Sequence, residues 1–347
     1  MNDIDINLKE RMAHYNVAGL STATILNGQI STIEQYGLLE AGTTRMVNHQ
    51  SVFSACSISK FLTSILVMLL YEKGIVDLDE NVNRKLSSWK VPDHDFIRDK
   101  NITLRNLLSH QSGIIDPENS FMKLVSADNP SMTDLLMGRT AYCQVPITVK
   151  YEPESDFYYS DAGYCIIQLL IEDVTGKAYE ELVRELIFQP LNMSNSTFIK
   201  KISGDEVNRF TSGHNHKGNV VTGKFPIYPY PAAAGLWTTP IDLSNLVIEL
   251  INSLKGRSKI GLSISKTKEI IKPHGCKEFA GLGVFLDGFG DELEITSLGW
   301  GVGFQCMMVA FPYKDSGLVI MTNADLGVHQ QKGIIGEVYH SYLQAAR

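Results

Sequence analysis

The chain has 347 residues, a length that corresponds to about two ordinary domains or one large α/β unit. Hydrophobic residues make up 44% of it and charged residues 20%, which argues against a disordered chain and favours a globular one. The 31 Lys and Arg against 38 Asp and Glu give a formal charge of −7, so we expect neither nucleic acid nor an anionic membrane surface as a partner.

The first elements predicted along the chain are a helix and a β-hairpin. The helix covers about residues 5–15, and two β-rich runs follow it, Gly19–Leu26 and Gln29–Tyr36. Asn27-Gly28 joins these runs, and Asn-Gly is the strongest short hairpin signal because both residues tolerate a positive φ.

A short strand over Ser51–Ser54 leads into the most apolar helix of the chain, which is predicted from Ser57 to Lys73 and closed by Gly74. Its apolar run from Phe61 to Tyr71 is too short to cross a bilayer, so no membrane span is expected. Further helices are predicted over Leu104–Leu108, Met132–Met137, Tyr164–Val174 (closed by Gly176), Tyr179–Phe188 and about residues 332–345. Further strands are predicted over Leu282–Leu286, Leu293–Ser297, Phe304–Ala310 and Leu318–Thr322.

Strands near both ends with helices between them predict an α/β (α+β) fold. We expect one antiparallel sheet, completed by both termini and flanked by helices, with a mostly helical inserted lobe. The sheet lobe would comprise residues 1–55 and 272–347, the helical lobe residues 56–271, and the active site would lie between them.

The five cysteines, an odd number without a C-x-x-C pair, suit reduced thiols better than a disulfide framework. The N-terminal residues contain no apolar stretch typical of a secretory signal. We therefore expect a cytoplasmic protein.

Cofactor and metal signals are weak. His214 and His216 have metal-like spacing, but no Cys or carboxylate cluster nearby completes a ligand set. The glycine-rich stretch from Gly299 to Gly303 is expected between strands and opens no helix, which argues against a dinucleotide loop. His110 is expected to be a hydrogen-bonded structural histidine. No cofactor and no metal are therefore predicted.

The remaining chemical signal is Ser-x-x-Lys, which places a serine and a lysine one turn apart on the same helix face. A partly desolvated lysine there can accept the serine proton, and the helix N-terminus offers N–H groups to an oxyanion. The motif occurs at Ser57/Lys60, Ser87/Lys90, Ser120/Lys123, Ser263/Lys266 and Ser265/Lys268, and the tetrapeptide SISK occurs twice.

Context selects Ser57, because its helix is apolar enough to bury Lys60, whereas Ser263 lies within a solvated basic stretch. Two other features support this choice. Tyr159 and Asp161 stand just before a predicted helix, and the strand over Leu293–Ser297 leads to Gly299, where a backbone N–H would face the nucleophile.

With these residues, the sequence resembles the serine β-lactamase and penicillin-binding-protein superfamily, and within it the class C-like branch that includes esterases and D-amino-acid peptidases. The resemblance spans nearly the whole chain. The blocks that carry it, in order, are FSACSISKFLTSILVMLLYEKGIVDLDENV (53–82), ITLRNLLSHQSGI (102–114), YYSDAGY (158–164), FQPLNMSNSTF (188–198), AAAGLWTTPIDLSNL (232–246) and LGWGVGFQ (298–305).

The resemblance implies a role for each matching residue. Ser57 matches the nucleophile, Lys60 the general base, and Tyr159 the tyrosine that passes the proton to the leaving group. Ser297-Leu298-Gly299 matches the Lys/His-x-Gly element on the strand beside the site. The oxyanion hole would be formed by the backbone N–H groups of Ser57 and Trp300.

The sequence departs from the family pattern at two positions. Asp161 stands where Asn is usual, and an ionised carboxylate can hold Lys60 but cannot donate to a substrate carbonyl. Ser297 stands where Lys or His is usual, so a cation that would pair with a substrate carboxylate is missing. Both changes argue against strong recognition of β-lactams and D-Ala-D-Ala, although drift around an intact acylation centre remains the alternative.

We therefore predict a serine hydrolase that forms an acyl-enzyme on Ser57 and acts on small esters or peptide-like amides. One alternative is a D-stereospecific peptidase or carboxypeptidase. The other is a catalytically weak penicillin-binding sensor, which the residues at 161 and 297 favour. The predicted partner is a small-molecule or peptide-like substrate, and the sequence does not determine the natural substrate, the oligomeric state or the physiological role.

Overall fold

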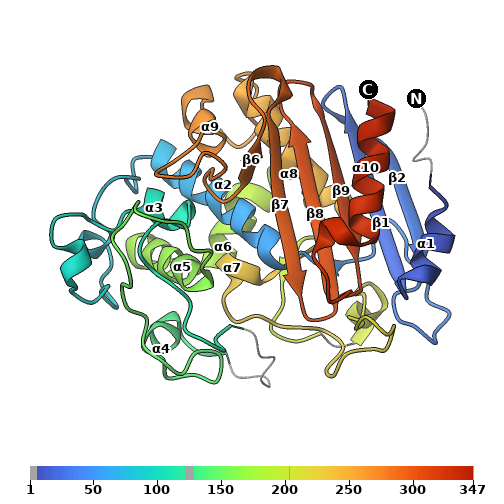
Figure 1. Cartoon of the computed structure of the whole chain (residues 1–347), viewed down its shortest axis with the longest axis horizontal. Coiled ribbons are helices and arrows are strands. Elements are labelled where there is room, and N and C mark those ends of the chain that lie inside the picture. Colours follow the sequence, from blue (N-terminus) through green and yellow to red (C-terminus); the bar gives the residue numbers. More distant parts are fainter. Residues whose placement is uncertain (1–5, 122–128, 203, 347) are drawn as a thin grey trace.

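An antiparallel sheet forms the right-hand half of the molecule in the view of Figure 1. The computed structural model describes residues 6–121, 129–202 and 204–346, and within them six strands follow the order β2-β1-β9-β8-β7-β6. Their bounds are β1 Gly19–Leu26, β2 Gln29–Gly37, β6 Phe285–Asp287, β7 Glu294–Gly301, β8 Phe304–Phe311 and β9 Ser316–Thr322. Because β1 pairs with β9, both ends of the chain complete one sheet, and the predicted fold class is confirmed.

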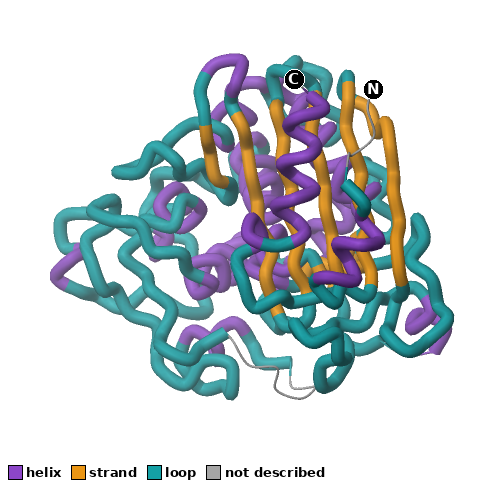
Figure 2. Tube along the Cα trace, turned by 45° about the vertical axis from the view of Figure 1, so that its right-hand side comes forward, coloured by secondary structure: helices purple, strands orange, loops and turns teal. Residues whose placement is uncertain are grey.

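The two faces of the sheet are covered by different helices. The helices α1 (Leu8–His14) and α10 (Ile334–Ala346) pack on one face, and α10 crosses the strands in Figures 1 and 2. The central strand β8 is buried along its whole length, since Met307 and Val309 contact this helix pair while Cys306 and Met308 belong to the main core on the other side. Such a strand needs apolar residues in succession, and the sequence FQCMMVAF supplies them.

The part of the chain between β2 and β6 is mainly helical in its described residues and surrounds one buried helix, α2 (Ser59–Glu72), whose residues from Ser59 to Leu70 are buried. A small sheet in the order β3-β5-β4 supports its N-terminus. The other helices of this part are α3 Leu104–Leu108, α4 Met132–Leu136, α5 Asp161–Thr175, α6 Tyr179–Val183, α7 Pro231–Ala234, α8 Pro240–Leu254 and α9 Ile264–Ile270. The small strands are β3 Phe53–Ser54, β4 Thr197–Phe198 and β5 Leu236–Thr238.

The structure contains a long helix, α8, that was not predicted from the sequence. It begins after Thr239, whose side-chain hydroxyl accepts a hydrogen bond from the amide of Asp242. It packs against β1, β2 and β9, although it lies inside the range predicted for the helical lobe. The division of the chain into two lobes stays a prediction.

Two further corrections concern the site. Ser57 lies in a 3₁₀ turn, Cys56–Ile58, and the α-helix proper begins at Ser59. Gly299 and Gly301 were expected between strands but belong to β7, because they pair with Cys306 and Phe304 of β8. In the described residues, no helix combines the length and the apolar character required to span a bilayer.

Removing apolar volume beneath α10 should destabilise the sheet. Ile320 of β9 is completely buried in the cluster beneath α10, so Ile320→Ala should lower the free energy of unfolding by about 2–5 kcal/mol. Ile33 on the edge strand β2 is 38% exposed, and Ile33→Ala should cost less than about 1 kcal/mol. Urea denaturation of both variants measures the difference, and equal losses would contradict this account of the core.

Candidate active site

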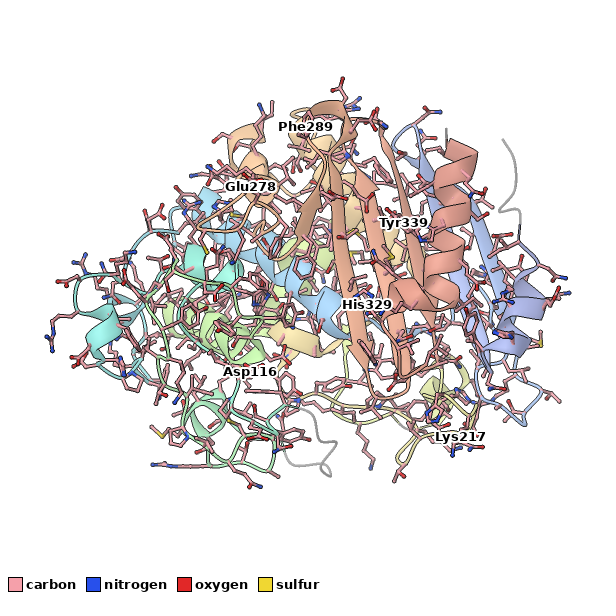
Figure 3. All side chains as sticks on the ribbon, viewed as in Figure 1. Asp116, Lys217, Glu278, Phe289, His329 and Tyr339 are labelled. Carbon is pink, nitrogen blue, oxygen red and sulfur yellow. The ribbon has the colours of Figure 1, made fainter. Side chains whose placement is uncertain are left out.

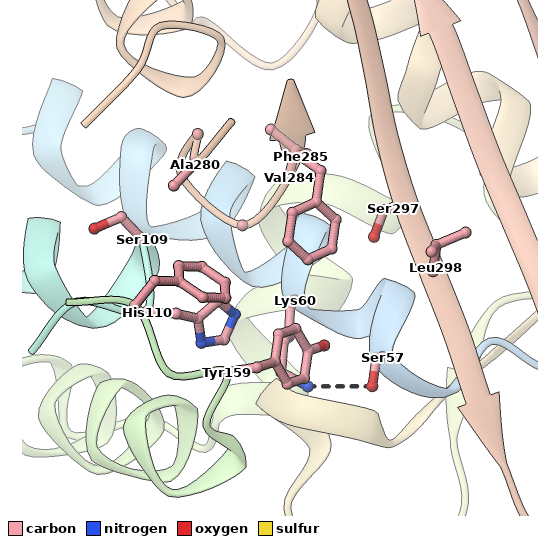
Figure 4. Close-up of a pocket in the computed structure, with 13 residues that line it drawn as sticks. Ser57, Lys60, Ser109, His110, Tyr159, Ala280, Val284, Phe285, Ser297 and Leu298 are labelled. Carbon is pink, nitrogen blue, oxygen red and sulfur yellow. Dashed lines mark hydrogen bonds between the residues drawn. The ribbon is translucent and has the colours of Figure 1, made fainter. Parts of the chain in front are cut away.

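Ser57 is held at the start of α2 by a tightly bonded turn (Figure 4). Cys56, just before it, has a φ of 47°, in the left-handed region that residues with a side chain rarely adopt. The Ser59 hydroxyl donates to the carbonyl of Cys56 at 2.6 Å and accepts from the amide of Leu236 at 3.0 Å. The turn is thereby tied to β5, and the Ser57 side chain is directed into a pocket.

Lys60 lies one turn further along α2 and is only 2% exposed. Its ammonium donates to Ser57 Oγ at 3.3 Å, to Asp161 Oδ1 at 2.5 Å and to the carbonyl of Ala233 at 3.0 Å. Burial lowers the pKa of Lys60, but the charge of Asp161, the interaction with Tyr159 and the hydrogen bonds to both residues together outweigh it and raise the pKa above its usual value. Lys60 is therefore a cation that contacts the predicted nucleophile.

The N-terminus of α5 supplies Asp161 and is itself held by a second carboxylate, Asp116. Asp116 accepts from the amides of Asp161 and Ala162, each at 2.9 Å, and from the Ser160 hydroxyl at 2.8 Å. Burial and then the charge of Asp161 raise the pKa of Asp116 to about 6. Asp116 thus fixes the direction in which Asp161 faces Lys60, and the sequence reasoning missed it.

Tyr159 stacks between the lysine and a histidine. The Lys60 ammonium lies 4.7 Å from the centroid of the Tyr159 ring. The centroids of the Tyr159 and His110 rings lie 4.2 Å apart, and the angle between the two ring planes is 29°. Burial raises the pKa of the Tyr159 hydroxyl, while the positive charge of Lys60 and a hydrogen bond with Ser57 oppose that rise. Tyr159 therefore stays protonated near neutral pH with its hydroxyl directed at the Ser57–Lys60 pair.

His110 is buried, and its Nδ1 accepts from the amide of Ser160 at 3.1 Å. Burial and the charge of Lys60 hold its pKa well below the usual value, so the ring is neutral and Nε2 carries the proton. This agrees with the structural role expected from the sequence. The histidine also lines the pocket, which the sequence did not indicate.

The strand β7 forms the opposite wall of the pocket. Ser297 is buried and lines the pocket with Ser57, Lys60 and Tyr159 (Figure 4). A Cβ at Gly299 would lie 2.3 Å from both the carbonyl oxygen of Ala55 and the sulfur of Cys306, so only glycine permits this close approach.

Trp300 follows on the same strand, and its side chain points out of the pocket. Its indole N–H donates to Asp325 Oδ1 at 2.8 Å, and the residue is substantially exposed. Any role of Trp300 in the site therefore belongs to its backbone N–H.

The structure thus brings together most residues that the sequence singled out. Ser57, Lys60, Tyr159 and Ser297 share one pocket, and Asp161 contacts Lys60. The second SISK tetrapeptide has a different place, because Ser263 caps α9: it accepts from the amide of Lys266 and donates to Glu72. Four residues were not identified from the sequence as part of the site: His110, Asp116, Phe157 and Phe285. Of these, only His110 lies in a sequence block that carried the resemblance.

The close contact at Gly299 predicts a strong effect of one added methyl group. Gly299→Ala should lower the free energy of unfolding by about 1–3 kcal/mol, because backbone of the nucleophile turn must move. Gly163→Ala is the matched control, since its Cβ would meet no atom closer than 3.6 Å and alanine favours the helix α5. Thermal unfolding of both variants tests the contact, and an equally stable Gly299→Ala protein would contradict it.

Known proteins show the same architecture and sequence pattern. Residues 4–334 match the family model described as Beta-lactamase. The chain is 27% identical over 194 residues to "Penicillin-binding protein 4*" of Bacillus subtilis, which covers 54% of this chain and 40% of that protein. It spans 40–62% of the length of such curated relatives.

Two solved structures share the fold. The octameric penicillin-binding protein homologue of Pyrococcus abyssi superimposes with a TM-score of 0.79 at 20% identity, covering 99% of this chain and 77% of that one. The D-amino acid amidase of Ochrobactrum anthropi SV3 superimposes with a TM-score of 0.77 at 24% identity, covering 98% and 97%. Because the family model matches nearly the whole sequence, this chain belongs to the Beta-lactamase family, within the superfamily of serine β-lactamases and penicillin-binding proteins.

Proposed function

We propose that the chain is a serine hydrolase that forms an acyl-enzyme on Ser57. The observation that carries this proposal is the buried Lys60 ammonium 3.3 Å from the Ser57 hydroxyl, at the base of a pocket. Burying a lysine ammonium costs free energy unless the charge is paired and hydrogen-bonded. This ammonium is held where it also contacts the hydroxyl that would attack a carbonyl.

The proposed reaction proceeds in two steps. The Ser57 oxygen attacks the substrate carbonyl, and its proton passes through Lys60 and Tyr159 to the departing alcohol or amine. The backbone N–H groups of Ser57 and Trp300 would stabilise the tetrahedral oxyanion. Water then attacks the acyl-enzyme by the reverse proton route and releases the acid.

The Lys60–Asp161 pair limits this chemistry. Lysine must be neutral to accept a proton, whereas Asp161 at 2.5 Å favours its charged form. The neutral fraction of Lys60, and with it the rate of acylation, should increase as the pH rises. Acylation of weakly reactive carbonyls should therefore be slow at neutral pH, which favours activated or unhindered esters over amides.

Two other functions are compatible with the site. The relative "Penicillin-binding protein 4*" and the Lys60–Asp161 pair favour a weakly catalytic penicillin-binding sensor. The fold shared with a D-amino acid amidase keeps a D-stereospecific peptidase as an alternative. Turnover of a p-nitrophenyl ester beside a D-amino-acid amide separates the hydrolases, and a penicillin that labels Ser57 without turnover would identify the sensor. The cytoplasmic location stays a prediction.

The two SISK serines should differ completely in their effect on activity. Ser57→Ala should lower kcat for p-nitrophenyl acetate by roughly 10³-fold or more, because the nucleophile is lost. Ser263→Ala should leave kcat unchanged and cost about 1 kcal/mol of stability, because it removes a helix cap. Initial rates and labelling by a fluorophosphonate test this pair, and an unimpaired Ser57→Ala enzyme would refute the proposed function.

Asp161 should set the pH at which the site becomes active. Asp161→Asn removes the charge that raises the Lys60 pKa, so the acid limb of the kcat/KM profile should move to lower pH by about 1–3 units. Asp173→Asn changes the same residue type on the same helix, away from Lys60, and should leave the limb in place. A limb that stays fixed or moves upward in Asp161→Asn would show that Lys60 is not the proton acceptor.

A further inference from the structure

Four aromatic side chains gather beside the Ser57 pocket, and we call them the aromatic rim: Phe157, Tyr159, Phe279 and Phe285. The ring centroids lie 5.1 Å apart for Phe157 and Phe279, and 6.3 Å apart for Tyr159 and Phe285, whose planes differ by 25°. Phe157 also lies within 6.3 Å of Phe285. The rim therefore joins the segment before α5 to the first residue of β6, two parts of the chain that are distant in sequence.

The rim is partly open to solvent, unlike an ordinary core cluster. Tyr159 is 41% exposed and Phe279 is 43% exposed. The pocket itself has a volume of about 10 Å³, room for about one water molecule. A substrate whose carbonyl reaches Ser57 must therefore keep its larger groups outside this pocket, which Phe157, Tyr159 and Phe285 of the rim line. Adjoining exposed aromatic faces favour apolar and aromatic ligand groups.

Two cations near the rim are each paired with a carboxylate. Among the described residues that line the pocket, Lys60 is the one that carries a charge. Its ammonium is paired with Asp161. Lys277, two positions from Phe279, is paired with Asp156 at 3.0 Å. Ser297 occupies the place in β7 that faces the pocket, and it carries no charge. The described site thus offers an aromatic surface and no unpaired cation to a substrate carboxylate.

We infer that the aromatic rim binds the leaving group of the substrate, a neutral alcohol or amine that carries an aromatic ring. This inference rests on the proposed function, because it depends on Tyr159 delivering the proton to the leaving group. In that step the bond from Ser57 Oγ to the acyl carbon forms, the bond from that carbon to the leaving oxygen or nitrogen breaks, and the serine proton goes to the leaving atom. Tyr159 belongs to the rim, so the leaving group departs along it.

The test compares matched esters on the intact protein. Benzyl acetate places a ring on the leaving side, ethyl phenylacetate places one on the acyl side, and ethyl acetate has none. The expected kcat/KM for benzyl acetate exceeds that for ethyl acetate by roughly 10-fold. Ethyl phenylacetate gains no such advantage. A para-carboxylate on benzyl acetate should remove the preference, because the described site holds no free cation to receive it.

Variants of the rim supply the structural control. Phe279→Ala and Phe285→Ala should each reduce the benzyl-to-ethyl ratio of kcat/KM several-fold. Phe289, at the tip between β6 and β7 (Figure 3), lines a second cavity together with Phe279, so the matched control is Phe96→Ala, because Phe96 is 44% exposed and lines neither that cavity nor the Ser57 pocket. It should leave the ratio unchanged.

The outcomes separate this inference from the proposed function. A ratio near one, a ring preference on the acyl side only, or a ratio insensitive to Phe279→Ala and Phe285→Ala overturns the inference while Ser57-dependent ester hydrolysis stands. The absence of Ser57-dependent turnover of every ester overturns both.

Discussion

The ion pair between Lys60 and Asp161 is the interaction on which the site depends. A buried ammonium is strongly unfavourable unless a partner compensates for its lost hydration, and Asp161 does so at 2.5 Å. The pair joins the start of α2 to the start of α5, so it also fixes the relative position of these two largely buried helices. Asp116 completes this arrangement by holding the first amides of α5.

The other wall of the site depends on backbone proximity. The strand β7 approaches the nucleophile turn so closely that a side chain at Gly299 would collide with the carbonyl of Ala55. This approach brings Ser297 to Ser57 and places the following backbone beside the serine. The ion pair on one side and the glycine contact on the other leave a narrow opening, and the aromatic rim borders it. The site is therefore neutral and largely apolar apart from one paired lysine.

Much of this molecule follows from local sequence signals. Asn27 and Gly28 have φ values of 51° and 70°, as the Asn-Gly hairpin predicted, and Gly176 ends α5 in the left-handed conformation. The unbroken apolar run after Ser57 indicated a helix buried on all sides, and that context distinguished Ser57 from Ser263. Such features are local because a turn or a buried helix is specified by the residues within it.

Other features were decided only by tertiary structure. The helix α8 carries a Thr239-x-x-Asp242 start signal, yet its packing against β1 and β9 depends on residues from both ends of the chain. Asp116, Phe157 and Phe285 belong to no motif, because hydrogen bonds and ring contacts between distant segments define their roles. The sequence by itself determined the fold class and the residues with reactive groups. The pKa of Lys60, the close approach of Gly299 and the aromatic rim arise from distances across the fold, which burial and long-range packing set.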